Sequence, residues 1–199
     1  MGSIKAVVMG ASWGGLNAYS RILSSLPERF PAAIMLVQHQ NASADNRLAW
    51  LLSRYCRLPV VSPNDKERIR AGHVYVAPPG YHMLVDADDT IALTVYRPVH
   101  FSRPSIDELF FSAGHVYGKN VIGLILTGAN EDGSAGLDYI RRRGGLTLAQ
   151  SPAGSEAPVM PEAAIALGAV RQVLDLERIG PFLVDCLEKS GRKTGRREE

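Results

Sequence analysis

The chain has 199 residues, of which 46% are hydrophobic and 21% are charged, with 19 Gly and 12 Pro. These values are typical of one soluble folded domain and exclude a collagen-like repeat or a disordered polymer. The formal net charge is +2, but residues 189–199 carry +3 and the other 188 residues carry −1. We therefore expect a domain over 1–188 and a basic, disordered tail over 189–199, with no nucleic-acid partner.

The sequence carries no signal for export or membrane insertion. No apolar run approaches the roughly 18 residues of a membrane span, and the first ten residues lack a secretory signal. Two cysteines, Cys56 and Cys186, are too few for a disulfide scaffold. We expect a cytoplasmic protein with two free thiols.

Short apolar runs alternate with helical patterns along most of the chain. The predicted strands of this alternation are 6–9, 33–37, 121–126, 146–149 and 170–174. One predicted helix carries an apolar face over 16–26, and another, which Ser43 can cap, carries one over 48–55. A further helix begins at a capping box over 105–108, in which Ser105 is the cap, and others cover 134–143, 162–167 with Pro161 at the first position, and a last segment that ends near 187. Such an alternation predicts an α/β fold with a doubly wound, mostly parallel sheet and helices on both faces.

The middle of the chain departs from this pattern. Residues 59–61, 73–77, 82–86 and 91–96 read as short strands, and the polar turn 87–89 joins the last two. We expect this stretch to form a small antiparallel hairpin flap on the main sheet.

Three loops at the ends of predicted strands carry unusual chemistry. The first, 10–15, reads GASWGG and fits the G-x-S-x-G elbow that exposes a serine hydroxyl, here that of Ser12. A dinucleotide-binding loop requires G-x-G-x-x-G, which Ser12 interrupts. His39 follows the second strand, and Asp132 follows the strand 121–126.

Considered singly, these residues have simpler explanations than catalysis. A lone His such as His39 is more often a hydrogen-bonded structural residue, and Asp132 can cap the next helix. Together, Ser12, His39 and Asp132 supply a nucleophile, a base and a carboxylate that orients the base. Their chain order, Ser-His-Asp, differs from that of the α/β-hydrolases, in which Asp lies between Ser and His.

Six motifs in this order resemble the catalytic domain of the bacterial chemotaxis receptor methylesterases, the CheB type. They are GASWGG, VQHQ, RPSIDELF, ILTGANEDGSAG, LAQ and VMPEAAIALG, within a similarity that runs from about residue 5 to about residue 187. The resemblance implies hydrolysis of glutamate γ-methyl esters on receptor cytoplasmic helices, often with deamidation of particular glutamines. It implies Ser12 as nucleophile, His39 as general base and acid, and Asp132 as its orienting partner, with no metal or organic cofactor.

The chain departs from the family at two loops. Trp13 stands where the family typically has a small polar residue, and Ala129-Asn130 replaces the Met-Gly of a TGMG loop. The implied oxyanion hole uses backbone N–H groups, which we place at Trp13 and Ala129 because backbone donors survive side-chain changes. The side-chain changes should alter the substrate pocket.

Family members commonly carry an N-terminal phosphorylatable receiver domain, whereas this chain begins at the first catalytic strand. We expect a stand-alone catalytic domain, unless the chain is a fragment. Its expected partner is a methylated chemotaxis-type receptor, and an activator or receiver protein acting in trans is a further open candidate. The alternative function is a non-catalytic signalling module with the same fold that docks on receptors or a kinase; a nucleotide-binding domain is a more distant alternative.

Overall fold

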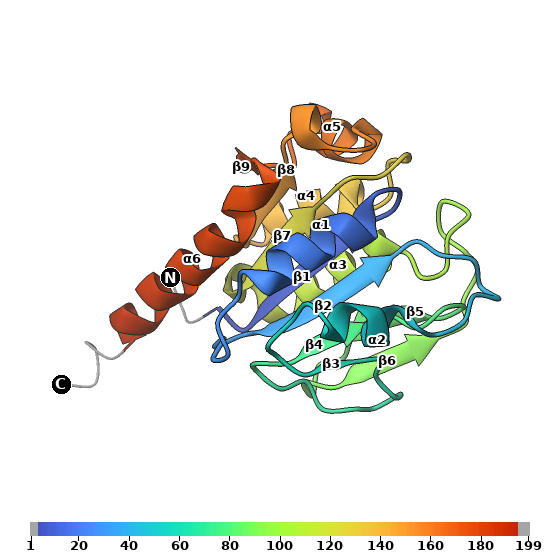
Figure 1. Ribbon diagram of the computed structural model, residues 1–199, viewed down its shortest axis with the longest axis horizontal. Coiled ribbons are helices and arrows are strands. Elements are labelled where there is room, and N and C mark those ends of the chain that lie inside the picture. Colours follow the sequence, from blue (N-terminus) through green and yellow to red (C-terminus); the bar gives the residue numbers. More distant parts are fainter. Residues whose placement is uncertain (1–3, 195–199) are drawn as a thin grey trace.

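The computed structural model describes residues 4–194, the last four of them by their backbone alone. Within that range, seven parallel strands form one sheet in the order β3-β4-β2-β1-β7-β8-β9 (Figure 1). Its strands are β1 (Ala6–Ala11), β2 (Ala33–Gln38), β3 (Val60–Val61), β4 (Val74–Val76), β7 (Val121–Ile125), β8 (Leu146–Gln150) and β9 (Gln172–Leu174). The central strands are buried along their length, as expected for a sheet covered on both faces.

Helices cover both faces of this sheet. One core cluster packs α1, α2 and α6 on the first face, and a second packs α3, α4 and α5 on the other. Figure 1 shows α1 and α6 side by side in front of the sheet, with α3 and α4 behind it. The helices are α1 (Gly15–Ser24), α2 (Leu48–Ser53), α3 (Ile106–Tyr117), α4 (Ser134–Arg142), α5 (Val159–Ala166) and α6 (Leu176–Thr194), with short 3-10 turns at Gly118–Asn120 and Pro152–Gly154. The predicted doubly wound α/β fold is confirmed.

The predicted small antiparallel hairpin is confirmed, but it includes only two of the four strands predicted in this stretch. Only β5 (His82–Val85) and β6 (Ile91–Thr94) form an antiparallel hairpin, which packs against α3. The other two strands of the stretch, β3 and β4, join the edge of the main sheet in parallel. The reason is burial: β4 is an uninterrupted apolar triplet covered on both faces, which suits a parallel sheet better than an exposed flap.

Two of the predicted helix caps are wrong. Ser43 bonds to Asn41 Oδ1 within a turn, and α2 begins only at Leu48. Ser105 stands at the N-cap position of α3 but makes no capping hydrogen bond through its side chain. The apolar face of α1 also differs, because Leu16 is exposed and Ala18 and Ile22 are buried instead.

The last two helices are longer than predicted. Helix α5 begins at Val159, so Pro161 lies in its first turn instead of opening it. Helix α6 continues to Thr194, which makes the first six residues of the predicted disordered tail helical. The backbone N–H of Ile4 donates to Ser190 Oγ at 3.1 Å and ties this extension to the start of the chain. The end of the predicted tail, 195–199, lies outside the described residues.

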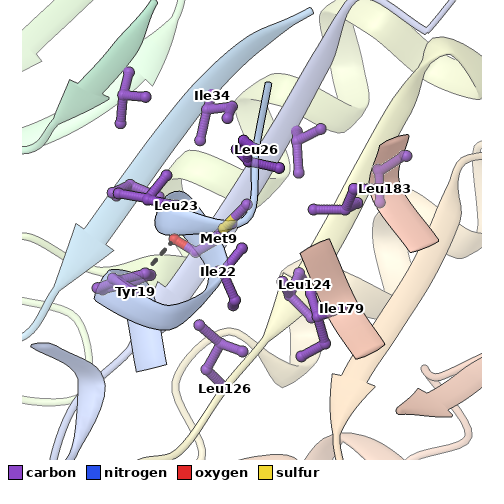
Figure 2. Packing of buried hydrophobic residues seen from close by; sticks show 14 of the residues in the cluster. Met9, Tyr19, Ile22, Leu23, Leu26, Ile34, Leu124, Leu126, Ile179 and Leu183 are labelled. Carbon is purple, nitrogen blue, oxygen red and sulfur yellow. Dashed lines mark hydrogen bonds between the residues drawn. The ribbon is translucent and has the colours of Figure 1, made fainter. Parts of the chain in front are cut away.

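Tyr19 anchors α1 to the sheet beneath it. Its side chain is fully buried in the core cluster that also contains Met9, Ile22 and Leu23 (Figure 2). The phenol donates to Val37 O at 2.8 Å, with Met9 O a second acceptor at 3.5 Å, and burial raises the pKa of Tyr19 well above its usual range. Helix α1 is thereby fixed against β1 and β2, the two strands that precede the loops of Ser12 and His39.

Replacing Tyr19 with Phe removes this bond and leaves Val37 O with one fewer donor in a buried site. We expect Tyr19→Phe to lower the free energy of unfolding by about 1 kcal/mol, measured by urea denaturation. The matched control is Tyr55→Phe, since Tyr55 is 53% exposed and should tolerate the change. Equal stability of the Tyr19→Phe variant and the parent protein would contradict this role.

Candidate active site

Strand order brings the three chemically unusual loops together. Strand β1 lies between β2 and β7, so the loops that follow these three parallel strands open at the same edge of the sheet. Ser12 directly follows β1, His39 directly follows β2, and Asp132 lies in the loop between β7 and α4. The backbone links them further: His39 N donates to Ala11 O at 3.0 Å, and Ser12 N donates to Thr127 O at 2.9 Å.

His39 and Asp132 are in direct contact. His39 Nε2 lies 2.7 Å from Asp132 Oδ2, and the Asp132 side chain is fully buried. A carboxylate only accepts hydrogen bonds, so the imidazole nitrogen that faces it carries the proton. This places the N–H of neutral His39 on Nε2 and leaves Nδ1 as the basic nitrogen.

The same carboxylate caps the N-terminus of α3. Asp132 Oδ2 accepts from Ile106 N at 2.7 Å, and Oδ1 accepts from Asp107 N at 3.1 Å and from Ser105 Oγ at 2.9 Å. The expected alternative role, capping the helix that follows Asp132, is wrong, because Gly133 occupies the N-cap position of α4. Asp132 instead satisfies the free N–H groups of a helix distant in sequence.

These contacts decide the charge of Asp132. Burial by itself raises the pKa of this carboxyl, but the hydrogen bond from His39 and the N–H groups of Ile106 and Asp107 outweigh burial and lower the pKa below its ordinary value. Asp132 is therefore ionised at neutral pH and available to stabilise a positive charge on His39.

Ser12 lies on the neighbouring loop but is not bonded to the imidazole. Within residues 4–194, Ser12 Oγ makes no hydrogen bond, and His39 Nδ1 faces Asn130 Nδ2 at 3.5 Å. The structure thus brings two of the three predicted residues into contact and holds the third beside them through the backbone. Nucleophile–base contacts are often long without substrate and tighten in the complex.

The two predicted oxyanion donors have similar surroundings. Ser12 O accepts from Gly15 N at 3.0 Å and from Gln38 Nε2 at 2.8 Å. In the second loop, Gly128 O accepts from Met160 N at 2.9 Å. The C=O and N–H of a trans peptide point in opposite directions. The N–H groups of Trp13 and Ala129 therefore point away from the protein groups that bind Ser12 O and Gly128 O. In the described part of the chain, neither N–H donates to a protein acceptor.

A second buried carboxyl group, that of Asp107, lies near Asp132. Asp107 is buried, its Oδ1 accepts from Gly136 N at 2.7 Å, and its Oδ2 lies 3.6 Å from His100 Nε2. Burial, together with repulsion by Asp132, raises the pKa of Asp107 to about 6, although the Gly136 N–H and His100 act in the opposite direction. Neither His100 nor Asp107 was among the site residues predicted from the sequence.

His100, Asp107 and Asp132 each offer a ligand atom, and these atoms lie within 4.8 Å of one another. Three such groups could surround a metal ion. Both oxygens of Asp132 and one of Asp107 already accept hydrogen bonds from the protein, so binding would have to break them. We assign no metal to this cluster.

Comparison with known proteins decides the family. The family model described as CheB methylesterase matches residues 7–183. The chain belongs to the CheB methylesterase family. A crystal structure of the Thermotoga maritima CheB methylesterase catalytic domain aligns with a TM-score of 0.88 at 30% identity, covering 94% of this chain and 99% of that one.

Two CheB relatives show how far the similarity extends. A Leptospira interrogans protein, provisionally named protein-glutamate methylesterase/protein-glutamine glutaminase, is 43% identical over 180 residues, which are 90% of this chain and 93% of the relative. A Bordetella parapertussis protein-glutamate methylesterase/protein-glutamine glutaminase is 40% identical over 195 residues, 96% of this chain but 55% of the relative. The predicted enzyme class is thereby confirmed at the level of the CheB family.

Sequence reasoning missed several residues of this candidate site. Gln38, Ser105 and Thr127 hold site loops together: Thr127 Oγ1 donates to Trp13 O at 2.8 Å, and Ser105 bonds to Asp132. Each is a polar residue beside an otherwise buried strand or helix end, and that contrast is the signal that could have marked them. Their partners lie far away in sequence and cannot be read from local spacing.

The raised pKa of Asp107 predicts a pH-dependent stability. The folded protein retains a proton on Asp107 between pH 3.8 and about 6, where the unfolded chain releases it. The stability that this group contributes is therefore full below pH 3.8 and is lost as pH rises through about 6. Asp107→Asn does not titrate, so its stability relative to the parent should increase by roughly 1 to 3 kcal/mol from pH 4 to pH 7.

Urea denaturation at several pH values measures this difference. Asp45→Asn is the control, because the Asp45 side chain is 77% exposed and its removal should leave the pH profile unchanged. A constant difference between the Asp107→Asn variant and the parent across this range would contradict the prediction.

Proposed function

We propose that this protein is a serine hydrolase that cleaves glutamate γ-methyl esters, and the side-chain amides of particular glutamines, on the cytoplasmic helices of chemotaxis-type receptors. The observation that carries the proposal is the 2.7 Å contact between His39 and the buried, ionised Asp132, one loop away from Ser12. Membership of the CheB family supports the reaction and the substrate class.

The chemistry follows from the protonation states in the site. Ser12 Oγ attacks the ester carbonyl carbon while His39 Nδ1 takes the hydroxyl proton. The tetrahedral intermediate collapses as the imidazolium gives this proton to the departing oxygen, which leaves methanol and an acyl-Ser12 ester. Water then attacks this ester with His39 again as base, and the products are the glutamate side chain and free Ser12. With a glutamine substrate, the first leaving group is ammonia.

Asp132 and two backbone amides support these steps. The Asp132 carboxylate keeps the imidazole in the required tautomer and stabilises the imidazolium that forms. We place the oxyanion between the N–H groups of Trp13 and Ala129, which are free to donate in the described structure. Fixed backbone donors cost little reorganisation as the charge develops. This chemistry needs no metal or organic cofactor.

The proposed substrate also sets the location and partners. Receptor cytoplasmic helices are accessible from the cytoplasm, and we propose that the enzyme acts there, with an activator or receiver protein in trans as a candidate regulator. Within residues 4–194, none of the helices combines the length and apolar character that crossing a membrane requires.

Ser12→Ala or His39→Ala should reduce the hydrolysis of a methyl-esterified receptor domain and of a nitrophenyl ester by on the order of 10³-fold or more, with folding intact. The double variant should be little worse than either single one, because the residues act as a unit. Ser43→Ala is the matched control, since Ser43 is an exposed loop serine. Substantial activity in a folded Ser12→Ala protein would end the nucleophile assignment, and a parent protein without activity would favour the non-catalytic module.

Trp13→Thr tests the main departure from the family. The Trp13 side chain is 70% exposed, which favours an indole that contacts the substrate over one that fills the cleft. We expect the variant to raise KM for the receptor several-fold and to leave turnover of a small ester unchanged. Trp50→Thr is the control, because Trp50 is 59% exposed on α2. Faster small-ester hydrolysis by Trp13→Thr would instead show that the Trp13 indole restricts access to the active site.

A further inference from the structure

The side chain of Gln38 joins the two loops that carry the proposed nucleophile and base. Its Nε2 donates to Ser12 O at 2.8 Å and to His39 O at 3.0 Å. The orientation of the amide follows from these contacts, because an amide oxygen would repel two carbonyl oxygens at the same place. One nitrogen therefore binds the backbone of both residues.

These two bonds fix two peptide planes of the site. The bond to Ser12 O holds the peptide that continues into Trp13, and so directs the Trp13 N–H to the opposite side. The bond to His39 O holds the peptide that continues into Gln40 and fixes the loop from which the imidazole projects. The Gln38 amide thus holds the peptide of the proposed oxyanion donor, Trp13, and the loop of the proposed base, His39, at a fixed separation.

The rest of the Gln38 amide is poorly accommodated. Its Oε1 is buried and, within the described residues, has no hydrogen-bond partner. It also requires Gly15, where a Cβ atom would lie 2.0 Å from Oε1. A buried acceptor without a partner is destabilising, and an apolar side chain of similar length would avoid that loss. The gain from the amide therefore lies in the two bonds that Nε2 donates.

From this geometry we propose that Gln38 is a positioning residue that sets the distance and orientation between the Trp13 N–H and His39. The proposal rests on the proposed function, because it assigns Gln38 a role in the same hydrolytic site. Both bonds of Nε2 go to the backbone of the site, so Gln38 acts through Ser12, Trp13 and His39. Losing it should slow the chemical step and leave substrate binding intact.

The experiment compares Gln38→Met and Gln38→Asn with the parent protein. Met has a similar length but donates nothing, and Asn keeps an amide that is one methylene too short to reach both carbonyls. We expect both variants to lower kcat for a nitrophenyl ester by about 10- to 100-fold, the size expected from a misplacement near 1 Å, with KM unchanged. Gln40→Met is the matched control, because Gln40 lies in the same loop as His39 and its amide makes only a 3.4 Å contact with Ala77 O, at the end of β4. This variant should retain the parent's kcat.

A second measurement does not depend on activity. A hydrogen bond to a carbonyl polarises its peptide, so loss of the Gln38 amide should change the backbone ¹⁵N chemical shifts of Trp13 and Gln40, the residues that follow the two bonded carbonyls. These shifts test the proposal even if the parent protein does not hydrolyse esters, which is the outcome that would refute the proposed function alone.

Parent kcat in a folded Gln38→Met or Gln38→Asn protein would overturn the proposal. So would an equal loss in the Gln40→Met control, or unchanged ¹⁵N shifts of Trp13 and Gln40. A fall in kcat at constant KM, together with changes in both shifts, supports it.

Discussion

One buried carboxylate connects the architecture of this protein to its chemistry. Asp132 is bound by the imidazole of His39, by two N–H groups that begin α3, and by the Ser105 hydroxyl. A buried negative charge is tolerated only where such donors compensate for lost hydration. The same contacts lower the pKa of Asp132 and fix the tautomer of His39. The position of α3 and the orientation of the proposed base therefore depend on each other.

The fold could be predicted from the sequence because its signals are local. Apolar strand runs and helical patterns predicted the doubly wound sheet, and the strand order of the structure places the loops of Ser12, His39 and Asp132 at one edge. The predicted cap at Ser105 failed because Asp132, in a distant loop, satisfies the N–H groups at the start of α3. The predicted cap at Ser43 failed because Ser43 bonds to Asn41 in a turn and α2 begins only at Leu48. The sequence pattern also could not separate the parallel edge strands β3 and β4 from the antiparallel hairpin, since all four segments are short.

The site itself was predicted only in part. Ser12, His39 and Asp132 stood out because their residue types suit one reaction, but the residues that hold their loops did not. Gln38 and Thr127 act through bonds to backbone atoms of residues distant in sequence. The departures at Trp13 and Ala129 change side chains and retain backbone N–H groups, so the proposed chemistry and the substrate pocket can vary separately. This separation explains how a chain of the CheB family can carry an exposed indole beside its proposed nucleophile.

The tautomer of His39 tests the account most directly. A long-range ¹H–¹⁵N NMR spectrum of the labelled protein, recorded at mildly alkaline pH, identifies which ring nitrogen carries the proton. If Asp132 orients the base as described, His39 carries its proton on Nε2, and Nδ1 has the chemical shift of an unprotonated nitrogen. Asp132→Ala should abolish this preference. A proton on Nδ1 in the parent protein, or the same tautomer after Asp132→Ala, would contradict the account.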